Sequence, residues 1–475
     1  MRTQYLSPSY PSHLRLNLIL SIVLLIILPA CSPLAPSPRA TLQEELPPHF
    51  SLYSDNDSSN SDFNTNWWED FYWTDLDALV KKALAQNLTL KQVWARLQQA
   101  QAITNISNSD RWPNFNYSGS ANHNRNAHQT NNNSHITTSD SFTLALTSSY
   151  ELDLWGRVAA NINADTLSAQ ASADDWRTAQ LSIAAQVTQT AIKLTTHSLL
   201  IPLAQQRWQR AQQQLQLLQL RYNQGMTTAI DIAQQRRRVA EYRAMILPLE
   251  EQKEQLNYEL ALLLGELPSW NWTPQQQKLP QLTPLDNIGI PSDLLAQRPD
   301  VRAAGLRLQA ADWSVTAARA DRLPAIRLSA DGNINSNHIN DLFDNWLANL
   351  AASVSGPLFD GGRRNAVVKQ ARAGVDERLA NYKETVLSAM KEVESALMQE
   401  DKRALELQAI ITQVEQQQQL CEHQQWRYIN GDNSYLSLLE NMQTLNLLQQ
   451  RQLQQRRDLL LARTALHQAL GGSIK

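Results

Sequence analysis

One strand-to-helix junction occurs twice in this chain, and it constrains the fold more than any other feature. Over residues 142–152, and again over 346–358, apolar and polar side chains alternate. Alternation over about ten residues suits a strand with lipid on one face and water on the other. Each alternating stretch leads into an Ala- and Gln-rich segment of more than sixty residues, which begins at Arg157 and at Arg363. We therefore expect each strand to continue directly into a very long helix.

The second half of the chain repeats the plan of the first. Landmarks of different kinds recur at one offset of 206 residues: Arg157 and Arg363, Arg221 and Arg427, Gly225 and Gly431, Leu264 and Leu470. A constant offset of this kind indicates a duplicated unit. The chain is therefore divided into a first repeat, 67–291, and a second repeat, 292–475.

Each repeat is predicted to hold two strands followed by long helices. The strands are expected at about 113–123, 142–152, 324–334 and 346–359, with an Asn- and His-rich solvated loop at 122–135. The long helices are expected at 157–223 and 363–430, and shorter ones at 75–110, 226–265, 292–321 and 434–470. A helix of 67 residues is roughly 100 Å long, a distance that two of the shorter helices laid end to end can span. The Pro- and Trp-rich segment 266–291 should then lie at mid-height, outside the helices.

The first thirty residues have the pattern of a secretory signal. Two arginines precede an apolar run, which ends in Leu28-Pro-Ala-Cys31. This motif resembles a bacterial lipobox, in which the cysteine becomes the lipidated first residue; a plain signal peptide is the alternative. Ser32 follows, where an aspartate would suggest retention in the inner membrane. Residues 1–30 are thus predicted to be removed, and 31–66 to be a lipidated tether.

Composition excludes several classes of function. A formal net charge of -3 gives no basic surface for nucleic acid. No catalytic motif, phosphate-binding glycine loop or metal-spaced Cys/His cluster is present, so no enzyme, cofactor or metal centre is predicted. The loop with His123, His128 and His135 could capture metal weakly, but solvation explains it better. Cys421 lies on an apolar helix stripe and is expected to be a small buried residue.

The number of strands in each chain indicates how many chains assemble. Four strands in lipid would leave unpaired edges, so several chains must close a barrel. Two chains would supply eight strands, which leave an interior just filled by side chains. Three chains would supply twelve, and a conduit therefore favours a homotrimer.

Several motifs resemble those of the outer-membrane efflux family, the TolC-like proteins, and its lipoprotein branch. They are Trp67-Trp68, Tyr150-Glu-Leu-Asp-Leu-Trp-Gly-Arg157, Arg298-Pro-Asp-Val-Arg302, Pro357-Leu-Phe-Asp-Gly-Gly-Arg363 and Leu470-Gly-Gly472. The resemblance implies a mostly α fold with membrane β: a trimer with a twelve-stranded β-barrel, a periplasmic α-helical barrel and an equatorial belt. It also implies a passive outer-membrane conduit that works with a periplasmic membrane-fusion adaptor and an inner-membrane resistance-nodulation-division pump.

The resemblance further implies a gate at the two helix-to-helix turns of the periplasmic end. Gly225 and Gly431 would form these turns, and the family's gate carboxylate falls on Glu440, with Glu in place of the usual Asp. Asp231 and Asp432 are further candidates. The Arg236-Arg237-Arg238 run is a candidate partner of Glu440, although it could simply be a solvated face. Asp360 is expected to be a helix N-cap.

Two classes of function remain open. The first is a passive export channel, in which drug efflux competes with metal-ion efflux and type I protein secretion. The second is an adhesive coiled-coil protein of the cell surface. The alternating strands and the 206-residue repeat favour the channel.

Overall fold

The computed structural model describes residues 34–36, 66–130, 133–275, 278–282, 297–432 and 434–472. Cys31 and most of the N-terminal tether lie outside these residues, as does much of the predicted segment 266–291. The chain divides into two compact units, and each takes segments from both predicted repeats. The first unit holds 98–171 and 305–381 with the N-terminal segment, and the second holds 42–97, 172–304 and 382–475.

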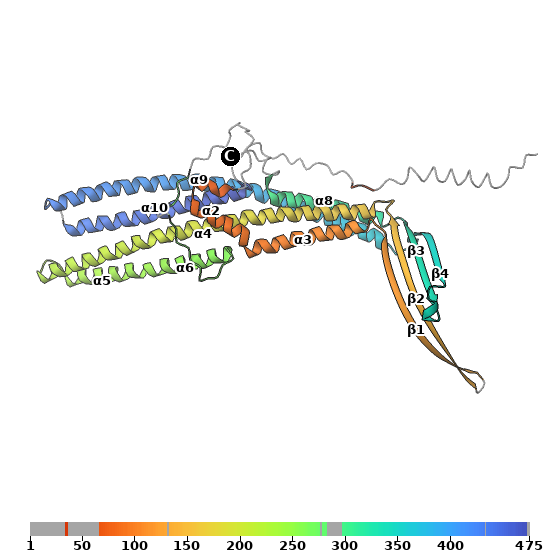
Figure 1. The fold of residues 1–475 in the computed structure, drawn as a ribbon. Helices are drawn as coiled ribbons and strands as arrows, with labels where there is room; N and C mark the ends of the chain where they lie inside the picture. Colours follow the sequence, from red (N-terminus) through yellow and green to blue (C-terminus); the bar gives the residue numbers. More distant parts are fainter. Residues whose placement is uncertain are drawn as a thin grey trace, which may run out of the picture. The chain divides into compact units, whose positions relative to one another are not determined.

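An antiparallel sheet in the order β1-β2-β3-β4 dominates the first unit (Figure 1). Its strands are β1 (Asn114–Thr130), β2 (Asn133–Leu152), β3 (Ala325–Ser336) and β4 (Trp346–Ser355). A short 3-10 helix, η3 (Ile339–Asp341), lies between β3 and β4. Because β1 and β4 each pair with one neighbour only, the described chain leaves both edges of the sheet open.

The two faces of the sheet differ in polarity as the alternation predicted. The register places these residues on the apolar face: Tyr117, Leu144, Leu146, Leu328, Leu350 and Val354. The polar face carries Asn116, Thr147, Glu151, Arg327, Asp331 and Asn349. Apolar side chains are strongly exposed, 91% for Tyr117 and 81% for Leu350. Large exposed apolar surfaces mark sites of interaction with lipid or protein. The apolar face of the sheet is therefore expected to be covered by one of these in the assembled protein.

The predicted loop at 122–135 is wrong. β1 continues to Thr130 and β2 begins at Asn133, so the pair is a long hairpin whose ladder includes His123 opposite Asp140. The Nδ1 atom of His123 lies 2.5 Å from an oxygen of Asp140. Asn and His have low strand propensity, but cross-strand pairing overrides that preference once the neighbouring strand is fixed.

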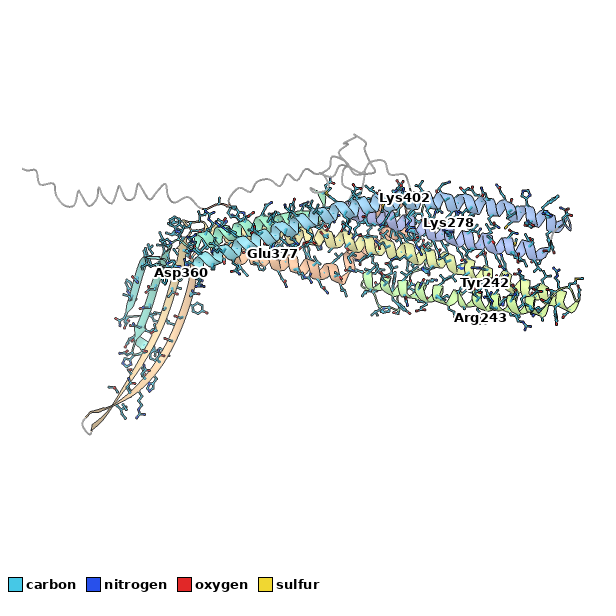
Figure 2. The ribbon with its side chains drawn as sticks, turned by 180° about the vertical axis from the view of Figure 1, so that it is seen from behind. Tyr242, Arg243, Lys278, Asp360, Glu377 and Lys402 are labelled. Atoms are coloured by element: carbon cyan, nitrogen blue, oxygen red, sulfur yellow. The ribbon has the colours of Figure 1, made fainter. Side chains whose placement is uncertain are left out.

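Each strand-to-helix junction is capped by a carboxylate. Asp153 accepts hydrogen bonds from the backbone N–H groups of Val158 and Ala159 at 3.0 and 2.8 Å, at the start of α4 (Arg157–Asn223). Asp360 (Figure 2) does the same for Gly362 and Arg364 at 2.9 and 3.1 Å, at the start of α9 (Arg363–Ile429). The predicted N-cap role of Asp360 is therefore confirmed, and these bonds lower the pKa of its carboxyl group.

The second unit is a bundle of helices. Two of them begin within this unit and end in the first: α3 (Leu88–Ser109) and α8 (Pro299–Ala320). The others are α2 (Thr74–Gln86), α5 (Ala229–Ala244), α6 (Ile246–Leu263) and α10 (Tyr435–Ala469), with η2 (Trp67–Phe71) and the later parts of α4 and α9. Among the helices in the described part of the chain, none is both long and apolar enough to cross a membrane.

Two of the predicted helices are in fact interrupted. The helix predicted at 75–110 divides at Asn87, whose backbone is extended. The Asn87 side chain accepts from the Leu90 N–H at 3.0 Å and donates to the carbonyl of Leu263 at 2.8 Å. The helix predicted at 226–265 begins only at Ala229 and divides at Met245. Apolar periodicity continues across such breaks, so it could not reveal them.

The core of this unit is built on tryptophans. Trp67 and Trp73 are fully buried, together with Leu76, Ile192 and Leu260. His467 stacks on Trp67 with ring centroids 5.2 Å apart. Burial, and secondarily the charge of Arg463, lowers the pKa of His467 to about 3, so this histidine is a neutral core residue. Cys421 is buried as predicted.

Candidate functional site at the helical turns

Two helix-to-helix turns close the same end of the second unit (Figure 1). Gly225 and Gly431 have positive φ angles of 73° and 82°. The N–H groups that follow them, on Met226 and Asp432, donate to the carbonyls of Arg221 and Arg427 at 2.9 Å in both turns. These are left-handed C-terminal caps that favour glycine, and the predicted 206-residue equivalence extends to their hydrogen bonds.

The helices that leave the turns are capped differently. Thr228 begins α5 with a capping box, in which the Asp231 carboxylate accepts from the Thr228 N–H at 2.9 Å. Hydroxyl groups of Thr227 and Thr228 also donate to Asp231, and together these bonds lower its pKa to about 2. At the equivalent place in α10 a hydroxyl of Ser434 accepts from the Ser437 N–H at 3.2 Å. Asp231 therefore has a structural role at its own helix start.

Glu440 lies on the first turns of α10 and is exposed, beside the buried Leu438 and Leu439. Within the described part of the chain, its side chain forms no hydrogen bond or ion pair. Of the candidate partner run, Arg237 pairs with Glu241 on its own helix at 3.0 Å. A single chain thus leaves the Glu440 carboxylate open to water or to another copy.

Polar side chains form hydrogen bonds between the helices near the turns. Gln235 of α5 donates to the carbonyl of Ala211 at 2.9 Å, and Gln417 of α9 donates to the carbonyl of Asn441 at 3.1 Å. By the 206-residue offset, Ala211 is equivalent to Gln417 and Gln235 is equivalent to Asn441. The same pair of positions is therefore hydrogen-bonded in both repeats, but the donor and the acceptor are exchanged.

A second set of polar bonds joins the two helix pairs. Arg210 of α4 donates to the carbonyl of Met442 at 3.3 Å, and Gln443 of α10 donates to Gln214 at 2.9 Å. These residues could not be singled out from the composition of the sequence, because glutamine-rich surfaces also occur on solvated helices. They could have been recognised only by their spacing, which places them on the helix face that packs against the neighbouring helix.

The motif Arg298–Arg302 has a structural function in the same unit. Arg298 is buried and its guanidinium contacts Asp300 at 2.6 Å, Glu392 at 2.8 Å and the carbonyl of Ala469 at 2.8 Å. Arg302, from the same motif, pairs with the buried Asp174 at 3.3 Å. These contacts fix the start of α8 against α4, α9 and the end of α10.

The chain matches the outer membrane efflux protein family over residues 79–266 and 290–472. It belongs to this family. The predicted TolC-like fold, with four strands in each chain and long helices, is confirmed, and so is the predicted function in outer-membrane efflux. The family supplies channel components and is not a family of enzymes.

Three similar proteins illustrate the relationship. The pyoverdine export outer membrane protein OpmQ of Pseudomonas aeruginosa is 31% identical over 86% of this chain and 87% of its own length. The probable outer membrane lipoprotein SilC of Salmonella typhimurium is 26% identical over 91% and 93%. The solved structure of the outer-membrane channel OprN is 26% identical, with a TM-score of 0.81 over 92% of this chain and 99% of that chain.

Proposed function

We propose that this efflux protein is a passive trimeric conduit, which exports small organic compounds delivered by a periplasmic adaptor and an inner-membrane pump of the resistance-nodulation-division class. The observation that carries the proposal is the sheet of the first unit. It has an exposed apolar face, a polar face and two open edges. An open edge in lipid leaves backbone groups without partners, which costs several kcal/mol for each group.

Assembly of three chains removes both edges. β1 of one copy would pair with β4 of the next, and twelve strands would close a barrel with the polar face inside. The described residues suggest no internal energy source, so transport would follow the pump. Export of pyoverdine by OpmQ, as its name states, supports a small organic cargo for this chain as well.

The N-terminal segment supports lipid anchoring at Cys31. The backbone N–H of Leu34 donates to the carbonyl of Trp155 at 3.2 Å, just after β2 ends. Cys31 precedes Leu34 by three residues, a reach of about 10 Å at most. An acyl chain on Cys31 would therefore enter the outer membrane close to the end of the sheet, and the name of SilC as a lipoprotein is consistent with this.

The gate remains part of the proposal. Three copies of Glu440 would approach one axis in a closed ring, where like charges in a narrow passage attract cations. The α4–α5 turn and the α9–α10 turn lie at the same end of the unit and would frame the mouth. They hold Gly225, Gly431 and Asp432. Asp231 contributes through its helix cap and not through free charge.

One experiment tests the channel and its assembly together. Native mass spectrometry of the full chain in detergent should give three copies, and the same preparation should conduct ions in a planar bilayer. An adhesive coiled-coil protein would give no ion conductance in the planar bilayer. A conducting monomer or dimer would contradict the trimer while leaving the channel in place.

A further inference from the structure

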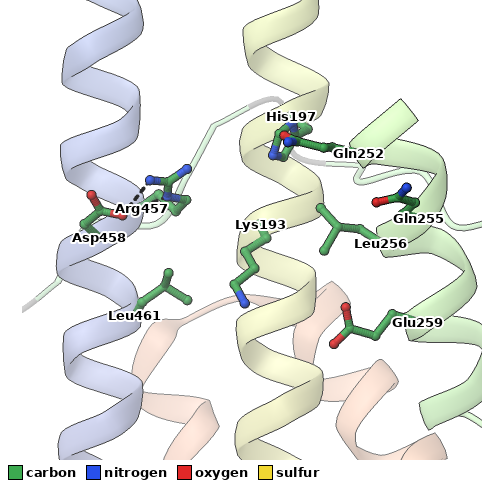
Figure 3. A pocket seen from close by; sticks show the side chains of 9 residues that line it. All are labelled: Lys193, His197, Gln252, Gln255, Leu256, Glu259, Arg457, Asp458 and Leu461. Atoms are coloured by element: carbon green, nitrogen blue, oxygen red, sulfur yellow. Dashed lines mark hydrogen bonds and ion pairs between the residues drawn. The ribbon is translucent and has the colours of Figure 1, made fainter. Parts of the chain in front are cut away.

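A cavity of about 370 Å³ lies in the second unit between three helices (Figure 3). Its floor is α4, which presents Lys193 and His197 one helical turn apart. α10 forms one wall with Arg457 and Leu461, and α6 forms the other with Leu256. The turns and the polar bonds described above do not include any of these residues.

The floor of the cavity holds hydrogen-bonding groups without partners. Lys193 is half-buried and forms no hydrogen bond or ion pair with the described residues. His197 is only 8% exposed, and its Nδ1 atom has no hydrogen-bond partner within the described chain. A buried polar atom without a partner costs about 1–3 kcal/mol, so such atoms usually mark a water or ligand position.

The carboxylates near the cavity are already occupied. Asp458 accepts from Arg457 at 2.8 Å, and Glu259 accepts from the hydroxyl of Thr190 at 3.3 Å. Arg457 also lies close enough to His197 to disfavour its protonation, after the larger effect of burial, and both lower the pKa of that histidine. Of the four charged side chains that line the cavity, Lys193 is thus the one without a hydrogen-bond or ion-pair partner among the described residues, so the cavity offers a free cationic donor.

We propose that this cavity binds an organic carboxylate, whose oxygens accept hydrogen bonds from Lys193 and Arg457 while its hydrocarbon part contacts Leu256 and Leu461. Charge-assisted bonds to a carboxylate are roughly twice as strong as neutral ones. A monoanion fits better than a phosphate dianion because Asp458 and Glu259 repel a second negative charge. The apolar side chains on both walls favour a ligand with a hydrocarbon tail over an inorganic anion.

The test uses the full chain in detergent and two probes of equal length and opposite charge. Hexanoate should bind measurably in isothermal titration calorimetry, and hexylammonium should not. The variant Lys193→Gln should weaken hexanoate binding about tenfold, the loss expected when one charge-assisted bond is removed. Lys253→Gln is the matched control, because Lys253 lies on α6 but does not line the cavity, and it should bind hexanoate as the wild type does.

Position is tested separately in crystals soaked with 6-bromohexanoate. The anomalous signal of bromine should lie between Leu256 and Leu461 in the wild type and be absent in Lys193→Gln. Equal affinity for the two probes, equal affinity in the two lysine variants, or a bromine peak elsewhere would each overturn the proposal. Conductance of the Lys193→Gln channel should equal that of the wild type, so failure here is distinguishable from failure of the proposed function.

Discussion

Arg298 and Glu392 form an ion pair 2.8 Å long between the start of α8 and the side of α9. The Arg298 side chain is 8% exposed, and it also donates to the carbonyl of Ala469, the last residue of α10. One side chain therefore joins three helices through positions that are far apart in sequence. Gly471 lies against it, where an added Cβ would come within 3.3 Å of the arginine.

Replacing Arg298 by methionine should destabilise the second unit by about 2–3 kcal/mol, because it removes bonds to charged groups and leaves a buried carbonyl unpaired. Thermal unfolding followed by helical circular dichroism measures the effect. Arg237→Met is the control, since its exposed pair with Glu241 should contribute only ~0.3–0.5 kcal/mol. Equal shifts in melting temperature for the two variants would contradict the assignment.

Charge on the apolar face of the sheet should be costly. Leu146→Arg places a guanidinium on the face proposed to meet lipid and should cost about 2–4 kcal/mol near the bilayer midplane. Thr147→Arg lies on the polar face and should cost much less. Urea unfolding of the protein refolded into lipid vesicles compares the two. If Thr147→Arg were the more damaging, the two faces would be reversed.

The start of α5 should loosen in acid. The pKa of Asp231 is about 2, below its ordinary 3.8, so the capping box contributes stability that is complete above pH 4 and is lost as pH falls through 2. Hydrogen-exchange protection in the first turn of α5, corrected for the intrinsic rate, should decrease over this range. The first turn of α10 is an internal control because Ser434 and Ser437 do not titrate. Asp231→Asn should abolish the pH dependence.

Lipidation should depend on Cys31. Labelled palmitate should enter the wild-type chain in cells and not Cys31→Ala, whereas Cys421→Ala should label normally because that thiol is buried. Equal labelling of wild type and Cys31→Ala would exclude lipidation at this residue. We expect the unlabelled variant to keep part of its efflux activity, because the barrel itself holds the protein in the membrane.

Glu440→Ala should raise the resting conductance of the channel and weaken block by multivalent cations, because it removes three charges from one passage. Single-channel recording measures both. Glu415→Ala, which removes an exposed carboxylate from α9, should change neither. Unchanged conductance and unchanged block in Glu440→Ala would remove this residue from the gate and leave the channel intact.

Much of the fold could be predicted because it rests on local patterns. The helix predicted at 157–223 is found with the same bounds, since the change to an Ala- and Gln-rich composition at Arg157 and the terminating Gly225 are both sequence signals. The break at Asn87 could not be predicted, because its side chain is held by the carbonyl of Leu263, far away in sequence. The same holds for the long hairpin, where pairing between β1 and β2 overrode the loop-like composition.

The sequence by itself determined the repeated strand-to-helix plan, the polarity of the two sheet faces and the glycines of the turns, because each depends on residues close together in the chain. Only the tertiary structure decided that Glu440 has no partner among the described residues and that Arg298 joins α8, α9 and α10. It also brought Lys193 and Arg457 to one cavity. The interactions of these side chains depend on distances between separate helices. Hydrophobic periodicity determines which helix faces pack together, but it does not determine which polar atoms meet between them.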